Sequence, residues 1–314
     1  MKEDKISSPA YKYQVAAFYC FCPLHQDQIH SLKEDLQLIA DQHDILGTTI
    51  LANEGVNGTI CGKHEAINKF KLVLQREFIN NKIEFKYSYV NAQAFRRFKV
   101  KNKDEIVTMG VEQVDPNKEV GEYISPNDWN QFICDPDTVV IDTRNKYEVG
   151  IGTFKGALNP HTENFRDFPE WVEKELRPLI GKDQKKRIGM FCTGGIRCEK
   201  ATSFLLKKGF TEVYHLKGGI LKYLEVVDKS DSLWGGECFV FDQRVALDHE
   251  LLPGDHLLCY ACGMPLNSKE RNSSDYIQGV QCSYCKDCFS DEDRIRFAER
   301  QKHYDNKSKE TLDS

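Results

Sequence analysis

Residues 192–198 read Cys-Thr-Gly-Gly-Ile-Arg-Cys, and this stretch decides how the middle of the chain folds. It follows the apolar run Ile188–Phe191, which predicts a strand, and precedes residues 199–208, whose apolar spacing predicts a helix. Cys192 is therefore expected at a strand end, where a Gly-Gly turn leads into a helix N-terminus. Backbone N–H groups and the helix dipole favour an anion at such a place. That anion would be the Cys192 thiolate, or a persulfide carried on it.

The rest of the stretch supports a nucleophilic Cys192. Arg197 supplies a nearby cation, which lowers a thiol pKa. The remaining residues form the predicted supporting loop: Thr193, Gly194, Gly195, Ile196 and Cys198. Cys198 has two interpretations, a resolving thiol for an oxidised Cys192 or a helix residue that faces the core. A structural cysteine at the end of a core strand is the alternative for Cys192, and the Gly-Gly pair and the arginine disfavour it.

Four residues separate Cys192 from Arg197, whereas a cysteine phosphatase needs five to wrap a phosphate. The shorter loop suits a single sulfur atom or a small anion. Strands and helices alternate over residues 119–230, which predicts a parallel sheet with the site at the carboxyl ends of its strands. The loop resembles the active-site loop of the rhodanese family, and flanking segments agree with it: Val139–Arg144, Tyr147–Gly150, Phe154–Asn159 and Lys217–Ile220.

The first 118 residues are predicted to form a ferredoxin-like domain, because residues 11–90 read as strand, helix, two strands, helix and strand. Asn53–Gly58 is rich in Asn and Gly and is expected to be a turn between two short strands. The predicted strands are 13–21, 48–52, 59–61 and 83–90, and the predicted helices are 26–42 and 64–78.

Residues 95–103 follow this unit and contain five basic side chains and no acid; we call them the basic strip. One interpretation is an edge strand with solvated lysines, and the other is a surface that contacts the phosphates of a nucleic acid. Alternation places Phe98 and Val100 on the face opposite the cations, so at least one of Phe95 and Phe98 is expected in the core rather than stacked on a base. The predicted RNA-binding residues are Arg96, Arg97, Lys99, Lys101 and Lys103.

Residues 231–314 are predicted to be a third, cysteine-rich domain with a charged tail. Two Cys-x2-Cys pairs with this separation are typical of a zinc ribbon, in which four thiolates bind structural Zn²⁺. An iron–sulfur cluster or plain reduced thiols are the alternatives, and Cys288 is either spare or an alternative ligand. The tail from Glu299 is charged and is expected to end in disorder. The predicted metal ligands are Cys259, Cys262, Cys282 and Cys285.

Composition agrees with a multidomain protein of the cytoplasm. A chain of 314 residues is expected to form two or three domains. Its twelve cysteines indicate reduced thiols, metal binding or catalysis. The N-terminus lacks the apolar core of a signal peptide, and no apolar run approaches the roughly 20 residues of a membrane span. The net charge of −5 does not by itself suggest a nucleic-acid-binding protein.

The three-part order of the chain, together with Asn53–Thr59, Val100–Val107, Cys192–Cys198 and the paired cysteines, resembles the bacterial rhodanese-like tRNA uridine hydroxylases. This resemblance implies a tRNA-modifying oxidoreductase that makes 5-hydroxyuridine at the wobble position, position 34, with molecular oxygen as co-substrate and Cys192 as catalytic cysteine. A sulfurtransferase that carries a Cys192 persulfide is the alternative. A non-catalytic scaffold is disfavoured, because both Cys192 and Arg197 are present.

Overall fold

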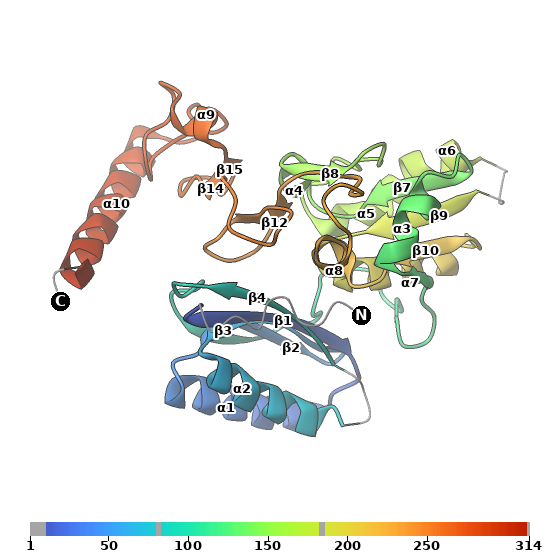
Figure 1. The fold of residues 1–314 in the computed structure, drawn as a ribbon, viewed down its shortest axis with the longest axis horizontal. Helices are drawn as coiled ribbons and strands as arrows, with labels where there is room; N and C mark the ends of the chain where they lie inside the picture. The colour runs from blue at the N-terminus through green and yellow to red at the C-terminus, as the bar shows by residue number, and fades with distance from the viewer. Residues whose placement is uncertain (1–10, 80–82, 182–185, 313–314) are drawn as a thin grey trace. The chain divides into compact units, whose positions relative to one another are not determined.

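The computed structural model describes residues 11–79, 83–181 and 186–312, with side chains up to residue 306. Residues 1–10, in which we expect no signal peptide, lie outside the described residues. The chain divides into two compact units, one ending at Cys238 and including His249–Leu252, the other formed by Phe239–Asp248 and the residues from Pro253 onward (Figure 1).

The first domain of unit one has the predicted ferredoxin-like order, with one strand added at its edge. Its sheet has the order β4-β1-β3-β2-β5, and β5 runs parallel to β2. The predicted turn at Asn53–Gly58 is wrong in extent: β3 begins at Gly55, which pairs with Phe21, so only Asn53 and Glu54 remain for the turn. The elements are β1 (Tyr13–Phe21), α1 (Gln26–Gln42), β2 (Leu46–Ala52), β3 (Gly55–Gly62), α2 (His64–Glu77), β4 (Glu84–Val90) and β5 (Phe98–Asn102).

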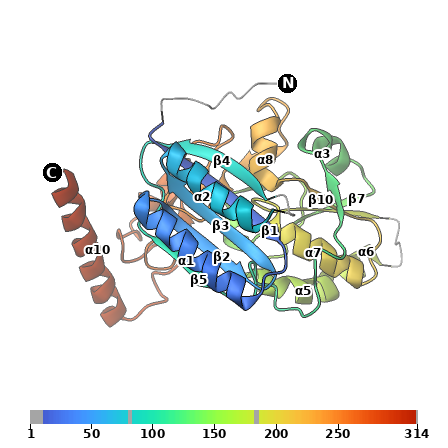
Figure 2. The same ribbon diagram turned by 90° about the horizontal axis from the view of Figure 1, so that it is seen from below.

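Helices α1 and α2 lie side by side on one face of this sheet (Figure 2). Phe18, Leu36 and Phe70 belong to the buried core between helices and sheet, and Phe98 and Val100 of β5 pack against it. Residues alternate between the two faces of a strand, so Ala17 and Tyr19 of β1 lie on the other face. We call this second surface the helix-free face.

The central domain is built on a parallel sheet of order β6-β10-β9-β7, as predicted. Helix α7 begins at Ile196, so the expectation that residues up to Cys198 are loop is wrong; Gly195 is the N-cap. The main elements are β6 (Glu122–Ile124), α3 (Pro126–Ile133), β7 (Thr138–Asp142), α4 (Lys146–Val149), β8 (Gly152–Phe154), η1 (Phe165–Asp167), α5 (Phe168–Trp171), η2 (Val172–Leu176), α6 (Arg177–Ile180), β9 (Arg187–Phe191), α7 (Ile196–Lys207), β10 (Val213–Leu216), α8 (Gly219–Val226) and β11 (Trp234–Gly236).

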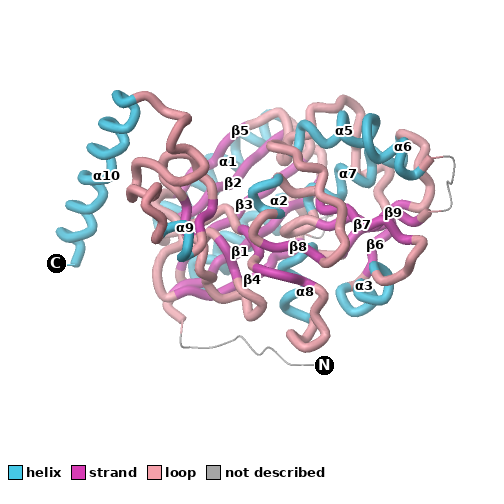
Figure 3. The backbone as a smooth tube through the Cα atoms, turned by 90° about the horizontal axis from the view of Figure 1, so that it is seen from above, coloured by secondary structure: helices cyan, strands magenta, loops and turns pink. Residues whose placement is uncertain are grey.

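Helices cover both faces of the parallel sheet. Helix α7 and the α5–α6 segment lie on one side, and α3 and α8 lie on the other (Figures 2 and 3). Phe204 of α7 and Val172 share a buried cluster with Met190 of β9. On the opposite side, the Trp129 ring of α3 contacts Phe191 of β9 edge-on at 6.3 Å between centroids. Strand β9 is thus buried on both faces, which fixes the position of the cysteine that follows it.

In its described residues, the second unit contains short strands and two helices. The tail from Glu299, which we expect to end in disorder, is helical as far as Leu312, and residues 313–314 lie outside the described part. Three acidic residues in the first turn of α10 favour a helix through its dipole, and the following Glu, Arg, Gln and Lys residues are good helix formers. No described helix is long and apolar enough to cross a membrane. The remaining elements are β12 (Cys238–Phe239), β13 (Ala246–Leu247), β14 (Leu257–Leu258), β15 (Pro265–Leu266), α9 (Ser268–Arg271) and α10 (Asp291–Leu312).

Candidate active site

Cys192 directly follows β9 and lies at the N-terminus of α7, as the sequence predicts. The residue is only 1% exposed. Its thiol sulfur accepts a hydrogen bond of 3.1 Å from the backbone N–H of Gly195. Backbone N–H groups of Ile220 and Leu221, in the first turn of α8, donate to the carbonyl oxygens of Cys192 and Thr193 at 2.9 and 3.1 Å. The first turn of α8 therefore holds the cysteine loop in place.

Glycine is required at position 195 for two reasons. Its φ of +107° is a conformation that L side chains rarely adopt, and a Cβ atom there would lie 2.8 Å from the hydroxyl oxygen of Tyr19. Gly194 differs, because a Cβ atom on it would meet nothing within 4 Å. The loop is therefore packed against the N-terminal domain at Gly195 and has free space at Gly194.

The surroundings of Cys192 favour its thiolate. Burial by itself raises the pKa of this thiol, but four interactions outweigh burial and lower the pKa well below its ordinary value: a hydrogen bond from the Cys198 thiol, the charge of Arg197, and the backbone N–H groups of Cys198 and Gly195. The pKa of Cys198 moves the other way, because that thiol is buried and its neighbour carries the negative charge. These opposite shifts favour the thiolate form of Cys192 and the protonated form of Cys198.

Cys198 faces the core from the first turn of α7. It is fully buried, and its sulfur lies 3.5 Å from the hydroxyl oxygen of Thr143. Cys198 also lowers the pKa of Cys192, so the core position and an influence on the Cys192 thiol occur together.

Arg197 lies near Cys192, but its guanidinium is bound by a carboxylate that sequence reasoning did not identify. Two guanidinium nitrogens donate to the carboxylate oxygens of Glu148 at 2.5 and 2.8 Å, and a third contact of 3.2 Å reaches Thr193 Oγ1. Glu148 is fully buried, and burial raises its pKa, but Arg197 and Arg144 hold that pKa below its usual value. The sequence signal for Glu148 was its place three residues after Asn145, a capping box that α4 does form.

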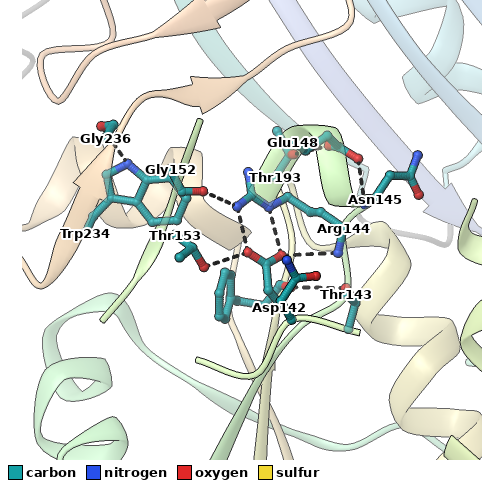
Figure 4. A network of polar contacts seen from close by, with 12 residues as sticks. Asp142, Thr143, Arg144, Asn145, Glu148, Gly152, Thr153, Thr193, Trp234 and Gly236 are labelled. Atoms are coloured by element: carbon teal, nitrogen blue, oxygen red, sulfur yellow. Dashed lines mark hydrogen bonds and ion pairs between the residues drawn. The ribbon is translucent and has the colours of Figure 1, made fainter. Parts of the chain in front are cut away.

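A second buried ion pair supports the segment that carries Glu148. Arg144 donates to both carboxylate oxygens of Asp142 and to the carbonyl oxygen of Gly152, and the guanidinium lies 5.1 Å from the Trp234 ring centroid (Figure 4). Thr153 donates to the same Asp142 carboxylate at 2.8 Å. These contacts join β7, β8 and β11 beside α4, and so position the partner of Arg197.

The N-terminal domain packs against the first turn of α7, a feature that sequence reasoning missed. The Tyr19 hydroxyl donates to Glu199 at 2.8 Å, and Tyr123 of β6 donates to the same oxygen at 3.0 Å. Lys200, 2% exposed, pairs with Glu54 at 2.8 Å and with Glu105 at 2.5 Å. Each pair joins residues far apart in the sequence, so only the folded chain reveals them.

The basic strip lies at the sheet edge formed by β5. Burial and the nearby charges of Arg97 and Lys101 lower the pKa of Lys99, as expected for cations that alternate along one face of a strand. Within the described residues, none of Arg97, Lys99, Lys101 and Lys103 pairs with a carboxylate. Both phenylalanines pack into hydrophobic clusters, Phe98 against the helix-side core and Phe95 beside Val15 and Ala94. Stacking of these rings on bases therefore has no support.

The four predicted metal ligands come together in the second unit. Their sulfur atoms all lie within 4.8 Å of one another, and three of the distances are 3.9, 3.7 and 3.7 Å. A tetrahedral zinc site with Zn–S bonds of about 2.3 Å requires sulfur–sulfur distances of about 3.8 Å, so the cluster fits one zinc ion. Cys288 is exposed and outside the cluster; its sulfur contacts the Tyr284 carbonyl oxygen at 3.6 Å. We call Cys259, Cys262, Cys282 and Cys285 the four-cysteine cluster.

Comparison with known proteins agrees with this architecture. The profile of the UPF0176 acylphosphatase like domain matches residues 13–106, and that of the Rhodanese-like domain matches residues 125–225. The tRNA uridine(34) hydroxylase of Prochlorococcus marinus strain NATL2A is 54% identical over 304 residues, which cover 97% of this chain and 95% of that relative. The protein of the same name from strain MIT 9313 is 53% identical over 309 residues, which cover 98% and 99%. This chain therefore belongs to the family of tRNA uridine(34) hydroxylases.

Proposed function

We propose that this chain hydroxylates carbon 5 of the wobble uridine of tRNA, with molecular oxygen as co-substrate and Cys192 as the catalytic thiol. The observation that carries the proposal is the low-pKa thiol of Cys192 at the N-terminus of α7, in a chain related over nearly its full length to proteins named for this activity. A thiolate is the reactive form of cysteine, and it is available here at neutral pH. A tRNA substrate also supports the expected cytoplasmic location.

Arg197 is proposed as the residue that keeps Cys192 ionised, and Glu148 as the residue that fixes Arg197. Both side chains are almost fully buried, so the bidentate contact sets the direction of the guanidinium. Gly195 supplies a backbone donor to the sulfur. Thr193 and Gly194 form the half-exposed side of the loop, where a flipped-out base has room to approach.

The basic strip is proposed as the surface that binds the tRNA backbone. The strand register supports this, because Lys99, Thr48, Thr59, Ala17 and Lys86 are successive Cα partners across the sheet. They form one row on the helix-free face. Four strand spacings of about 4.8 Å make this row about 19 Å long. It begins in the basic strip and ends beside Tyr19, which contacts the catalytic loop at Gly195. Phosphate contacts along this row would hold the RNA while one base enters the site.

The four-cysteine cluster is proposed to hold one structural zinc ion. The close approach of the four sulfur atoms favours a single ion over an iron–sulfur cluster, in which several iron and sulfide atoms would separate the cysteines. The zinc would stabilise the second unit, whose strands are short.

The test is a deletion strain complemented with this chain or with its Cys192→Ser variant, followed by mass spectrometry of wobble nucleosides. We expect 5-hydroxyuridine with the unmodified chain and none with the variant, because serine at neutral pH is not an anion. Equal 5-hydroxyuridine from a folded Cys192→Ser protein would reject the catalytic assignment. Sulfur transfer from thiosulfate to cyanide without any 5-hydroxyuridine would favour the sulfurtransferase instead.

A further inference from the structure

The N-terminal domain contributes to the surroundings of Cys192 as well as to the fold. Ile196, the first residue of α7, packs into a hydrophobic cluster with Phe21 and Ile106. The Tyr19 hydroxyl donates to Glu199 at 2.8 Å and lies 2.8 Å from the place that a Cβ atom of Gly195 would occupy. The helix-free face of the N-terminal sheet therefore closes one side of the cysteine loop.

Lys86 lies at this contact. It pairs in register with Ala17, so its side chain projects from the helix-free face, as that of Tyr19 does. Its ammonium nitrogen lies 5.0 Å from the centroid of the Tyr19 ring. Its Cε atom is 3.6 Å from the place that a Cβ atom of Gly218 would occupy. The adjacent Gly219 is so close to the loop that a Cβ atom there would lie 2.5 Å from the carbonyl oxygen of Cys192. Lys86 is thus held between Tyr19 and the start of α8, and both border the Cys192 loop.

The charges around Cys192 leave a role for another cation. Arg197 is paired with Glu148, which offsets part of its positive charge. The carboxyl group of Glu199 also lies near the thiolate, and burial raises its pKa. Lys86 forms no ion pair with any carboxylate among the described residues. The titratable and charged groups that act on Cys192 or on Lys86 are Tyr19, Glu84, Arg197, Cys198, Glu199 and Lys222.

We propose that Lys86 is a positioning residue of the active site, whose ammonium group supplies a positive charge from the N-terminal domain that stabilises the Cys192 thiolate. Burial lowers the pKa of Lys86, whereas the negative charges of Glu84, Cys192 and Glu199 raise it, in keeping with a lysine that faces this anionic group. Docking of the N-terminal domain would then activate the thiol of the central domain. The relevance to hydroxylation rests on the proposed role of Cys192, but the electrostatic effect on the thiol does not.

The experiment measures the ionisation of Cys192 in the full chain. The ultraviolet absorbance of the thiolate is followed against pH in each protein and in the same protein with Cys192→Ser, and the difference reports the ionisation that depends on Cys192. In Lys86→Met we expect the midpoint to move to higher pH by at least half a unit, about a threefold change in the dissociation constant. Lys86→Arg should keep the midpoint low. Lys71→Met is the matched control, because Lys71 lies over the Phe85 ring, on the helix side of the same strand.

An unchanged midpoint in a folded Lys86→Met protein would overturn the proposal, and so would an equal rise in Lys71→Met. If Lys86→Met does not fold, as judged by circular dichroism, Lys86→Gln provides the same test. The titration needs no tRNA and no hydroxylation. A failed role for Lys86 is therefore distinct from a failed function, which would appear as full 5-hydroxyuridine formation by Cys192→Ser.

Discussion

The buried pair of Arg197 and Glu148 permits a prediction that separates stability from thiol chemistry. The two side chains are 8% and 0% exposed and share hydrogen bonds of 2.5 and 2.8 Å. Arg197→Met leaves Glu148 as an unpaired buried carboxylate, and removing one member of a buried pair costs about 3–5 kcal/mol. For a unit of this size, each kcal/mol lowers Tm by about 2–4 °C, so we expect a loss of roughly 6–20 °C.

The double variant Arg197→Met/Glu148→Leu should regain most of this stability, because it leaves neither charge buried alone. It should not regain the low pKa of Cys192, because the cation that lowers this pKa is still missing. Thermal unfolding measures the first effect, and the thiolate difference titration against a Cys192→Ser background measures the second. If Arg197→Met lowers the free energy of unfolding by less than about 1 kcal/mol, the value of an exposed ion pair, the argument about burial is refuted. A low Cys192 pKa in the double variant would refute the argument about charge.

Three further predictions follow from other parts of the structure. Charge reversal of Arg97 and Lys101 together should weaken tRNA binding and reduce the slope of log affinity against log salt concentration by about 0.7 to 0.9 for each lost phosphate contact. Filter binding over a salt series measures this slope. An unchanged slope would favour the other interpretation of the basic strip, an edge strand with solvated lysines. Purified protein should contain about one zinc per chain by elemental analysis. Cys288→Ser should keep this zinc, and Cys282→Ser should lose it. Protein that is prepared without chelator and contains no metal would contradict the proposed zinc site. Hydroxylation should persist as pH falls below the ordinary thiol pKa of about 8.5 and decline only through the lower pKa of Cys192, because the reactive form is the thiolate; a pH–rate profile with its acid limb near 8.5 would contradict this.

Much of the fold was predictable because local signals and tertiary packing agree. Helix α1 spans the predicted residues 26–42, since its apolar spacing matches the face that packs on the sheet. Strand β9 and Cys192 were likewise found from an apolar run and a Gly-Gly turn. Where the predicted bounds of an element were wrong, backbone hydrogen bonds set the observed bounds. The carbonyl oxygen of Gly195 accepts a hydrogen bond from the N–H of Glu199, so α7 starts three residues before its predicted start. Pairing with β1 extends β3 back to Gly55.

The sequence by itself determined the domain types and identified Cys192, Arg197, the basic strip and the paired cysteines as candidates, because each of these features lies in a short stretch of the chain. Only the tertiary structure decided what surrounds the nucleophile. The Glu148 carboxylate that holds Arg197 lies 49 residues away in the chain, and the Tyr19 hydroxyl that reaches Glu199 lies 180 residues away. The pKa of a buried thiol depends on charges within a few ångströms in space. Folding of the central domain brings Glu148 to Arg197, and packing of the N-terminal sheet against the first turn of α7 brings Tyr19 to Glu199.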